Sequence, residues 1–360
     1  MIRPTPHVAA MSPYALAELN APASKRVISL SQNESLRQPS PQVSDVLVSA
    51  MTNAHLYPDP EWTELRNALA ALHGIPASGI LCGNGSMELI ACLTLTYCDE
   101  KSAVLAPAHA YPFFRTAAGL ARARYDTAPE VGVTASVDTL LAAVQPDTRI
   151  VFVANPGNPT GTRIPRVELD RLREGLRGDI LLVIDEAYGE FADHLGEPLF
   201  DLVSRGDTVI LRTFSKAYGL AGIRVGWGLF PENIASEVRK VMNPNNVSVA
   251  GQTAAATALS DQAYMRETCA ITAGLRDGFS NRLRKVGFYI AESFTNFALI
   301  RFYDAQAAQQ ADAILRAEGV VARAQSVAGL PDCLRVTVGT AEDLDLAASL
   351  LEHRAKGGKA

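Results

Sequence analysis

The chain has 360 residues, of which 48% are hydrophobic, so it can form a large domain, a smaller one and a substantial core. A formal net charge of -5, from 33 basic and 38 acidic residues without a basic block, argues against nucleic acid as a partner. Five cysteines without a CxxC pair argue against a disulfide framework and against a zinc site.

The N-terminal residues show no pattern of an export signal, and no apolar run approaches the ~18 residues of a membrane span. We therefore expect a cytoplasmic protein without a membrane partner. Residues 1–40 are rich in Pro, Ser and Ala, with one strand-like piece at 26–30. They predict an arm that packs on a small domain or on a partner subunit.

A first helix is predicted after the arm. Tyr57-Pro-Asp-Pro-Glu61 introduces it, and Pro60 suits the first helical position. Gly74 suits its C-terminal end. The apolar residues that repeat at spacings of 3, 4 and 3 are Trp62, Leu65, Leu69 and Leu72.

The central part of the chain, from residue 80 to about 231, alternates apolar strands with helical segments. Strands are predicted at 102–106, 149–154, 180–184, 208–211 and 225–230. Because these runs are apolar throughout, they indicate strands covered on both faces, as in a mainly parallel α/β sheet. We assign residues 41–250 to this large domain.

The C-terminal part, residues 251–360, is predicted as a second and smaller α+β domain. A long Ala-rich helical stretch at 251–286 leads away from the sheet. Strands are then predicted at 294–302, 320–323 and 334–338, with a final helix at 341–352.

Polar clusters follow three of the buried strands. Asn155-Pro-Gly-Asn-Pro-Thr-Gly161 follows the strand at 149–154, and Asp185-Glu-Ala-Tyr188 follows the strand at 180–184. The segment containing Lys216 follows the strand at 208–211. Ligands of open parallel sheets bind beyond the carboxyl ends of the strands, so these clusters should converge.

The residue types in these clusters suit pyridoxal 5'-phosphate (PLP), a cofactor with an aldehyde, a pyridine ring and a phosphate. Lys216 offers the amine that an aldehyde needs. Asp185 suits the ring nitrogen, and Asn158 and Tyr188 suit the ring oxygen. Taken singly, each has an ordinary alternative: a surface lysine, a helix N-cap at Asp185, a turn former at Asn158.

A phosphate site is predicted where a glycine-rich turn, residues 82–87, precedes a helical run at 88–95. Such a turn alone is also compatible with an ordinary left-handed turn. The side chains that would complete the phosphate site are Ser86, Thr213, Ser215 and Arg224.

Taken together, these motifs resemble the class I/II aminotransferases, which are fold-type-I PLP enzymes, and most closely the histidinol-phosphate aminotransferases. The resemblance spans roughly residues 14–352. The matching segments are Tyr57-Pro-Asp-Pro60, Gly83-Asn-Gly-Ser86, Asn155 to Gly161, Asp185 to Tyr188, Arg212 to Arg224, Asn296-Phe297 and Leu334 to Thr340.

The resemblance implies a mainly parallel seven-stranded sheet sandwiched by helices, with a smaller C-terminal α+β domain that the N-terminal arm completes. It also implies a homodimer with active sites shared across the interface. Lys216 would bind the cofactor covalently and then move a proton between substrate and cofactor. The other implied cofactor-binding positions are Gly85, Ser86, Met87, Asn158, Asp185, Tyr188, Thr213, Ser215 and Arg224, with Tyr57 from the other subunit; the implied substrate-binding positions are Tyr14, Asn33, Arg323 and Arg335.

The sequence departs from the family pattern where substrates are chosen. The family places an aromatic residue two positions after Pro107 to stack over the ring; here that position is His109, with Tyr111 two residues further on. We take His109 as the first candidate for this role and Tyr111 as the second. Met87 replaces an acidic residue, and the arm segment 33–41 differs from the family by Ser35, Arg37 and Gln38.

The predicted function is therefore PLP-dependent amino-group transfer, with histidinol phosphate as donor and 2-oxoglutarate as acceptor. An aromatic or other amino acid is the alternative donor. A decarboxylase or lyase that uses the same cofactor is an alternative of a different class, because some such enzymes carry a histidine over the ring. A non-catalytic regulator is disfavoured, since no DNA-binding extension is attached.

Overall fold

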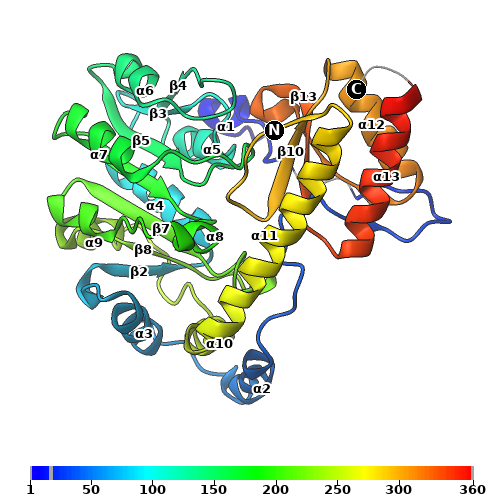
Figure 1. Cartoon of the computed structure of the whole chain (residues 1–360). Helices are drawn as coiled ribbons and strands as arrows, with labels where there is room; N and C mark the ends of the chain where they lie inside the picture. The colour runs from blue at the N-terminus through cyan, green and yellow to red at the C-terminus, as the bar shows by residue number, and fades with distance from the viewer. Residues whose placement is uncertain (1, 16–18, 358–360) are drawn as a thin grey trace.

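The computed structural model describes residues 2–15 and 19–357 (Figure 1). A seven-stranded sheet forms its larger part. In spatial order the strands are β2 (Ile80–Gly83), β8 (Gly226–Leu229), β7 (Thr208–Thr213), β6 (Leu181–Asp185), β5 (Thr148–Ala154), β3 (Ala103–Pro107) and β4 (Arg124–Ala128). Six of these strands run in the same direction, and β8 runs antiparallel to them. The predicted mainly parallel α/β sheet is confirmed.

Helices cover this sheet, and their apolar residues join those of the strands in one core. β2, β3, β6, β7 and β8 are buried along their whole length, which is why their sequences lack an alternating pattern. The helices are α3 (Thr63–His73), α4 (Ser86–Tyr97), α5 (Phe113–Leu120), α6 (Val137–Ala143), α7 (Arg166–Gly175), α8 (Gly189–Ala192), α9 (Glu232–Val238) and α10 (Val249–Ser260), with the 3-10 turns η2 (Ala77–Gly79), η3 (Asp193–Leu195), η4 (Phe200–Arg205) and η5 (Ala221–Ile223).

A small domain is built on a four-stranded antiparallel sheet with its own apolar core. The long helix α11 (Gln262–Lys285) runs from α10 along this domain (Figure 1). The sheet order is β12 (Arg323–Gln325), β13 (Leu330–Thr337), β10 (Phe297–Arg301) and β9 (Tyr289–Ile290); the remaining elements are α12 (Ala305–Ala317), β11 (Val320–Val321), η6 (Ser326–Ala328) and α13 (Ala341–Gly357).

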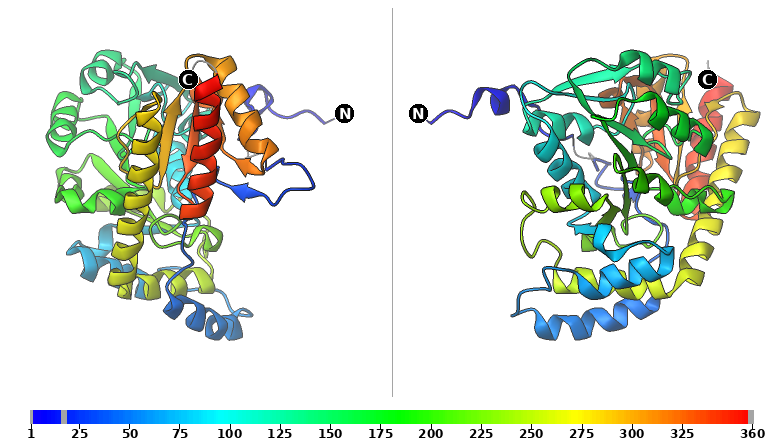
Figure 2. Two further views of the ribbon diagram at one scale, coloured as in Figure 1. Left: turned by 45° about the vertical axis from the view of Figure 1, so that its right-hand side comes forward. Right: turned by 90° about the vertical axis from the view of Figure 1, so that its left-hand side faces the viewer.

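The N-terminal arm contacts both parts of the molecule. Its strand β1 (Ile28–Ser29) pairs in parallel with β11 of the small domain. The short helix α1 (Pro6–Ala10) lies at the free end of the arm, beside α5 (Figure 2). Helix α2 (Pro41–Ala50) and the turn η1 (Met51–Asn53) follow the arm and pack against α10. The domain boundaries at residues 40 and 250 stay predictions.

Several predicted elements differ from the observed ones. Helix α3 begins at Thr63 rather than Pro60, because the Asp59 carboxylate accepts the N–H groups of Glu61 and Thr63 at 2.9 and 2.7 Å. Gly74 ends the helix as predicted. Leu72, predicted on the apolar face, is 38% exposed.

The single helical stretch predicted at 251–286 is interrupted at Asp261, whose carboxylate accepts the N–H of Tyr264 and starts α11. The strand predicted at 320–323 is two strands in two different sheets, because β11 pairs with the arm and β12 with β13.

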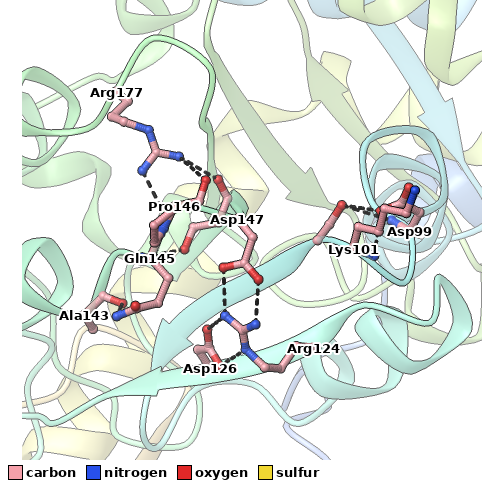
Figure 3. Close-up of polar contacts among 11 residues, drawn as sticks. Asp99, Lys101, Arg124, Asp126, Ala143, Gln145, Pro146, Asp147 and Arg177 are labelled. Atoms are coloured by element: carbon pink, nitrogen blue, oxygen red, sulfur yellow. Dashed lines mark hydrogen bonds and ion pairs between the residues drawn. The ribbon is translucent and has the colours of Figure 1, made fainter.

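Two strands of the large sheet, β2 and β4, were not predicted. The sequence of β4 is too polar for an apolar run because β4 lies at the edge of the sheet. Arg124 in β4 pairs with Asp126 at 2.8 Å and Asp147 at 2.6 Å, and Arg177 donates to nearby carbonyls (Figure 3). Charged side chains at a sheet edge discourage pairing with another chain.

Candidate active site

A cavity of about 460 Å³ lies where the carboxyl ends of β5, β6 and β7 meet the arm and the small domain. Most of the predicted site residues line it although they are far apart in sequence. From the large domain these are Ser86, Met87, Tyr111, Asn158, Asp185, Tyr188, Thr213, Ser215, Lys216 and Arg224, and from the arm and small domain Tyr14, Asn33, Arg323 and Arg335.

Lys216 follows β7 and its amine is held by the arm. Nζ donates to the carbonyl of Asn33 at 2.9 Å and to that of Gln32 at 3.3 Å. Burial, reinforced by the positive charge of Arg335, lowers the pKa of Lys216 to about 7. A large fraction of the amine is therefore unprotonated, and hence nucleophilic, near neutral pH.

This lowered pKa can be tested by labelling the cofactor-free protein with an acylating reagent. Only the neutral amine reacts, so labelling of Lys216 should rise about tenfold per pH unit below pH 7 and level off above it. A lysine with an ordinary pKa of about 10.4 would keep gaining reactivity through that range. Peptide mass spectrometry measures the rate. Reactivity of Lys216 that rises without levelling up to pH 10 would contradict the lowered pKa.

Asp185 is the last residue of β6, and its side chain lies at the base of the cavity. Oδ1 accepts the N–H of Ala187 at 3.1 Å. Burial, reinforced by the negative charge of Glu186, raises the pKa of Asp185 to about 7, and the hydrogen bond from Ala187 offsets only part of this. A cation held against this carboxylate would stabilise its ionised form.

The predicted pair for the ring oxygen lies close to Asp185 and is already oriented by hydrogen bonds. Asn158 Oδ1 accepts from Arg335 at 2.5 Å. The Tyr188 hydroxyl accepts from Asn33 Nδ2 at 2.7 Å, and its ring packs edge-on against Phe297 at 5.3 Å. Both polar groups therefore project into the cavity from fixed positions.

The N-terminus of α4 forms a cradle that fits a phosphate. Gly85 has a φ of +80°, and a Cβ added to Gly226 would lie 2.3 Å from the backbone nitrogen of Ser86, so both positions favour glycine. Arg224 Nη1 also reaches the Ser215 hydroxyl at 3.5 Å. The N-terminus of α4 has no side-chain cap, so its backbone N–H groups are available to an anion. The hydroxyls and the guanidinium beside it are further donors that bind an anion.

A second cationic region faces the cradle from the small domain. Arg335, on β13, donates to the carbonyl of Ser31 at 2.7 Å and to Asn158, and its Nε is buried without a partner. Among the described residues no carboxylate forms an ion pair with Arg335, and burial lowers its pKa. Arg323 donates to the carbonyl of Ala15 at 2.6 Å. This side of the cavity is suited to an anionic group of a substrate.

The family model described as "Aminotransferase class I and II" matches residues 25–351. The chain belongs to the class I and II aminotransferases. The resemblance inferred from its motifs is confirmed. The cavity is therefore the candidate active site of this aminotransferase.

Similar proteins agree with this placement. A curated histidinol-phosphate aminotransferase of Paramagnetospirillum magneticum is 42% identical over 97% of this chain and 98% of its own. One of Rhodospirillum rubrum is 39% identical over 95% and 94%. The crystal structure of histidinol-phosphate aminotransferase from Sinorhizobium meliloti in complex with pyridoxal-5'-phosphate superposes with a TM-score of 0.91, at 29% identity, over 99% of this chain and 98% of that one.

The aminotransferase cavity also contains residues that the motifs did not predict. The arm residues Ser31, Gln32 and Glu34 line it next to the predicted Asn33. Asn33 has a φ of 55°, and Thr337 and Asn296 hold it and its carbonyl through hydrogen bonds of 3.0 to 3.1 Å. Backbone carbonyls carry no sequence signal, so only the structure reveals that this bend holds the Lys216 amine.

Three predicted residues do not line the cavity. Gly85 acts through its missing side chain, as described above. Tyr57 is 87% exposed, so its predicted contact with a second subunit stays a prediction. His109 lines a neighbouring space of about 20 Å³, whereas Tyr111 lines the main cavity. Tyr111 is thus better placed than His109 to lie over a bound ring.

Arg37, the added charge in the arm, also lies outside the cavity. It pairs with Glu267 at 2.8 Å and stacks over the ring of Tyr264 at 4.0 Å. Its contacts fix the arm of the aminotransferase on α11, and they give it no direct contact with a bound substrate.

Proposed function

We propose that this aminotransferase uses PLP to move the amino group of histidinol phosphate to 2-oxoglutarate. The observation that carries the proposal is the meeting, in one cavity, of the buried amine of Lys216 with its lowered pKa, the buried side chain of Asp185 and arginines from both domains. The relatives that share 35–42% of the sequence over nearly the whole chain point to the same donor.

PLP, when bound, supplies an aldehyde for the amine and a ring that accepts the electron pair left when a C–H bond breaks. The residues that would hold it are those described above. The cradle of Ser86, Ser215 and Arg224 would bind the phosphate, while Asp185 would bind the ring nitrogen. Asn158 and Tyr188 would donate to the ring oxygen, and Tyr111 would cover the ring.

Lys216 has the second role of moving protons. Its Nζ, whose lowered pKa leaves a large fraction unprotonated near neutral pH, would be the base that takes the proton from the donor carbon. The same amine then returns a proton to complete the transfer. The bend of the arm at Asn33 holds Nζ through the Asn33 carbonyl, and Arg335 holds the same arm through the carbonyl of Ser31.

The two ends of the cavity would select an anionic donor. One end binds the cofactor phosphate, and Arg335, Arg323 and Tyr14 form the other. A phosphate ester and a dicarboxylic acid both bring an anion to that end, which suits the proposed donor and acceptor.

We also propose that two chains form a cytoplasmic homodimer in which Tyr57 reaches the partner's cavity.

The donor is tested by mixing the holoenzyme with one candidate at a time and recording conversion of the cofactor to its amino form by absorbance. Histidinol phosphate should convert it fastest, and histidinol and aromatic amino acids more slowly. A faster reaction with an aromatic amino acid would transfer the assignment to that donor. Release of carbon dioxide or ammonia without conversion would favour a decarboxylase or lyase instead.

Replacing Arg335 by leucine should mainly weaken the binding of anionic reactants. The loss of charge-assisted hydrogen bonds predicts a KM for histidinol phosphate and 2-oxoglutarate that is about 10- to 100-fold higher. The KM for histidinol, which lacks the phosphate, should change less. Arg301→Leu is the matched control, because Arg301 lies in the same sheet but pairs with Asp332 at the surface. Equal KM values for wild type and Arg335→Leu would refute the role.

A further inference from the structure

His109 connects two segments of different domains outside the cavity. Its Nδ1 lies 2.8 Å from the carbonyl oxygen of Ala328 in η6 of the small domain. A carbonyl only accepts, so Nδ1 carries the hydrogen and donates it. The backbone N–H of His109 donates to Glu130 Oε1 at 3.1 Å. The imidazole is thus oriented by the Ala328 carbonyl, and the backbone of His109 is fixed by Glu130.

Both connected segments contribute walls of the cavity. The loop of the large domain that carries His109 also carries Tyr111, which lines the cavity two residues further on. The segment that carries the Ala328 carbonyl contributes Val327 and Ala328 to the lining of the same cavity. The hydrogen bond from His109 therefore joins a lining segment of the large domain directly to one of the small domain.

The surroundings of His109 favour a fixed contact rather than a chance approach. Val133, in the turn that follows Glu130, packs in a small apolar cluster with Leu299 and Leu330 of the small domain. A Cβ added to Gly329 would lie 3.4 Å from His109 Nδ1, which is an ordinary van der Waals distance, so His109 packs beside this glycine. His109 and Val133 thus both contact the small domain.

We propose that His109 is a positioning residue: its Nδ1–H sets the distance between the Tyr111 loop and the small domain at η6, and thereby the spacing of the two segments that line the cavity. The proposal rests on the proposed function insofar as the amino donor binds in this cavity. It assigns His109 a role other than stacking over the cofactor ring. This role requires one hydrogen-bond donor at the Nδ1 position and does not require an aromatic ring.

Substitutions at His109 separate the donor from the ring. His109→Asn keeps an N–H close to the position of Nδ1 but has no aromatic ring, whereas His109→Phe keeps a ring and has no donor. His109→Leu has neither. All of them can be accommodated because His109 is only half-buried. If His109→Leu fails to fold, the comparison of His109→Asn with His109→Phe carries the same information.

The first measurement does not depend on turnover. Amide hydrogen exchange of residues 326–329 should be faster in His109→Phe and His109→Leu than in wild type, and unchanged in His109→Asn. This result can be obtained whatever the donor is, so it stays valid if histidinol phosphate proves to be the wrong substrate. Equal exchange in wild type, His109→Phe and His109→Leu would overturn the proposal.

The second measurement is steady-state kinetics with the best donor of the wild type. Loss of one neutral hydrogen bond predicts a KM about 3- to 10-fold higher in His109→Phe and His109→Leu, with the cofactor absorbance and affinity unchanged. His109→Asn should resemble wild type. The opposite order, in which His109→Phe is normal and His109→Asn loses cofactor affinity, would show that His109 stacks on the ring. Equal impairment of all variants would also overturn the proposal.

Discussion

Replacing Lys216 by alanine should abolish amino-group transfer while the protein stays folded. The substitution removes the covalent attachment point and the base that moves the proton, and general-base catalysis alone contributes up to about 10⁴-fold. We therefore expect kcat to fall about 10⁴-fold or more, because this one substitution removes both roles of Lys216. Borohydride reduction of the holoenzyme, followed by peptide mass spectrometry, should label Lys216 in wild type and nothing at this position in the variant.

The matched control is Lys240→Ala. Lys240 lies at the surface with its side chain 66% exposed and pairs with Glu237. Its replacement should leave kcat, KM and the borohydride label unchanged. The assignment of Lys216 would be wrong if Lys216→Ala retained turnover comparable with that of Lys240→Ala, or if the label in wild type resided on another lysine.

Much of the fold was predictable because its central strands are buried on both faces. Apolar runs such as 149–154 and 180–184 have few alternatives, and the observed β5 and β6 agree with them within one residue. The edge strand β4 escaped prediction because its solvent-facing positions are occupied by charged residues such as Arg124 and Asp126. Local capping also displaced a boundary, since the carboxylate of Asp59 starts α3 three residues after Pro60.

The large-domain half of the site was predictable for a topological reason. Asp185 ends a parallel strand, Asn158 and Lys216 each follow one, and the ends of parallel strands lie on one edge of the sheet. Their convergence follows from strand order rather than from any contact visible in the sequence. The order of their side chains inside the cavity, by contrast, needed the structure.

The contributions of the arm were less predictable. The carbonyls of Gln32 and Asn33 hold the Lys216 amine across more than 180 residues of sequence, and any residue type supplies a carbonyl. The roles of His109 and Tyr111 depend on where the loop after β3 turns, which a spacing of two residues does not determine. His109 is held by the Ala328 carbonyl, and Tyr111 enters the cavity instead.

Replacing Asp185 by asparagine should impair catalysis strongly, although less than the loss of Lys216, and leave cofactor binding largely in place. Asparagine keeps the shape and the hydrogen bond from Ala187, but it removes the negative charge that would keep the ring nitrogen protonated. Loss of one such preorganised electrostatic partner predicts a kcat about 10²- to 10³-fold lower. Asp179→Asn is the matched control, because Asp179 precedes β6 at its opposite end and is 51% exposed.

The same substitution has a pH-dependent effect on the stability of the cofactor-free protein. Burial raises the pKa of Asp185 from its ordinary value of 3.8 to about 7, so the folded state binds a proton more tightly than the unfolded state. The wild type therefore loses stability as the pH rises from about 4 to 7, by on the order of 4 kcal/mol, whereas Asp185→Asn does not. Urea unfolding should show that the free energy of unfolding of the variant rises relative to that of wild type through this window, and that the difference stays constant above it.

Because bound PLP would place a cation beside the carboxylate, saturating both proteins with PLP should reverse the difference in their free energies of unfolding. If Asp185→Asn is more stable than wild type by an amount independent of pH, the raised pKa of Asp185 is contradicted. If it stays more stable when PLP is bound, the placement of this carboxylate at the ring nitrogen is contradicted.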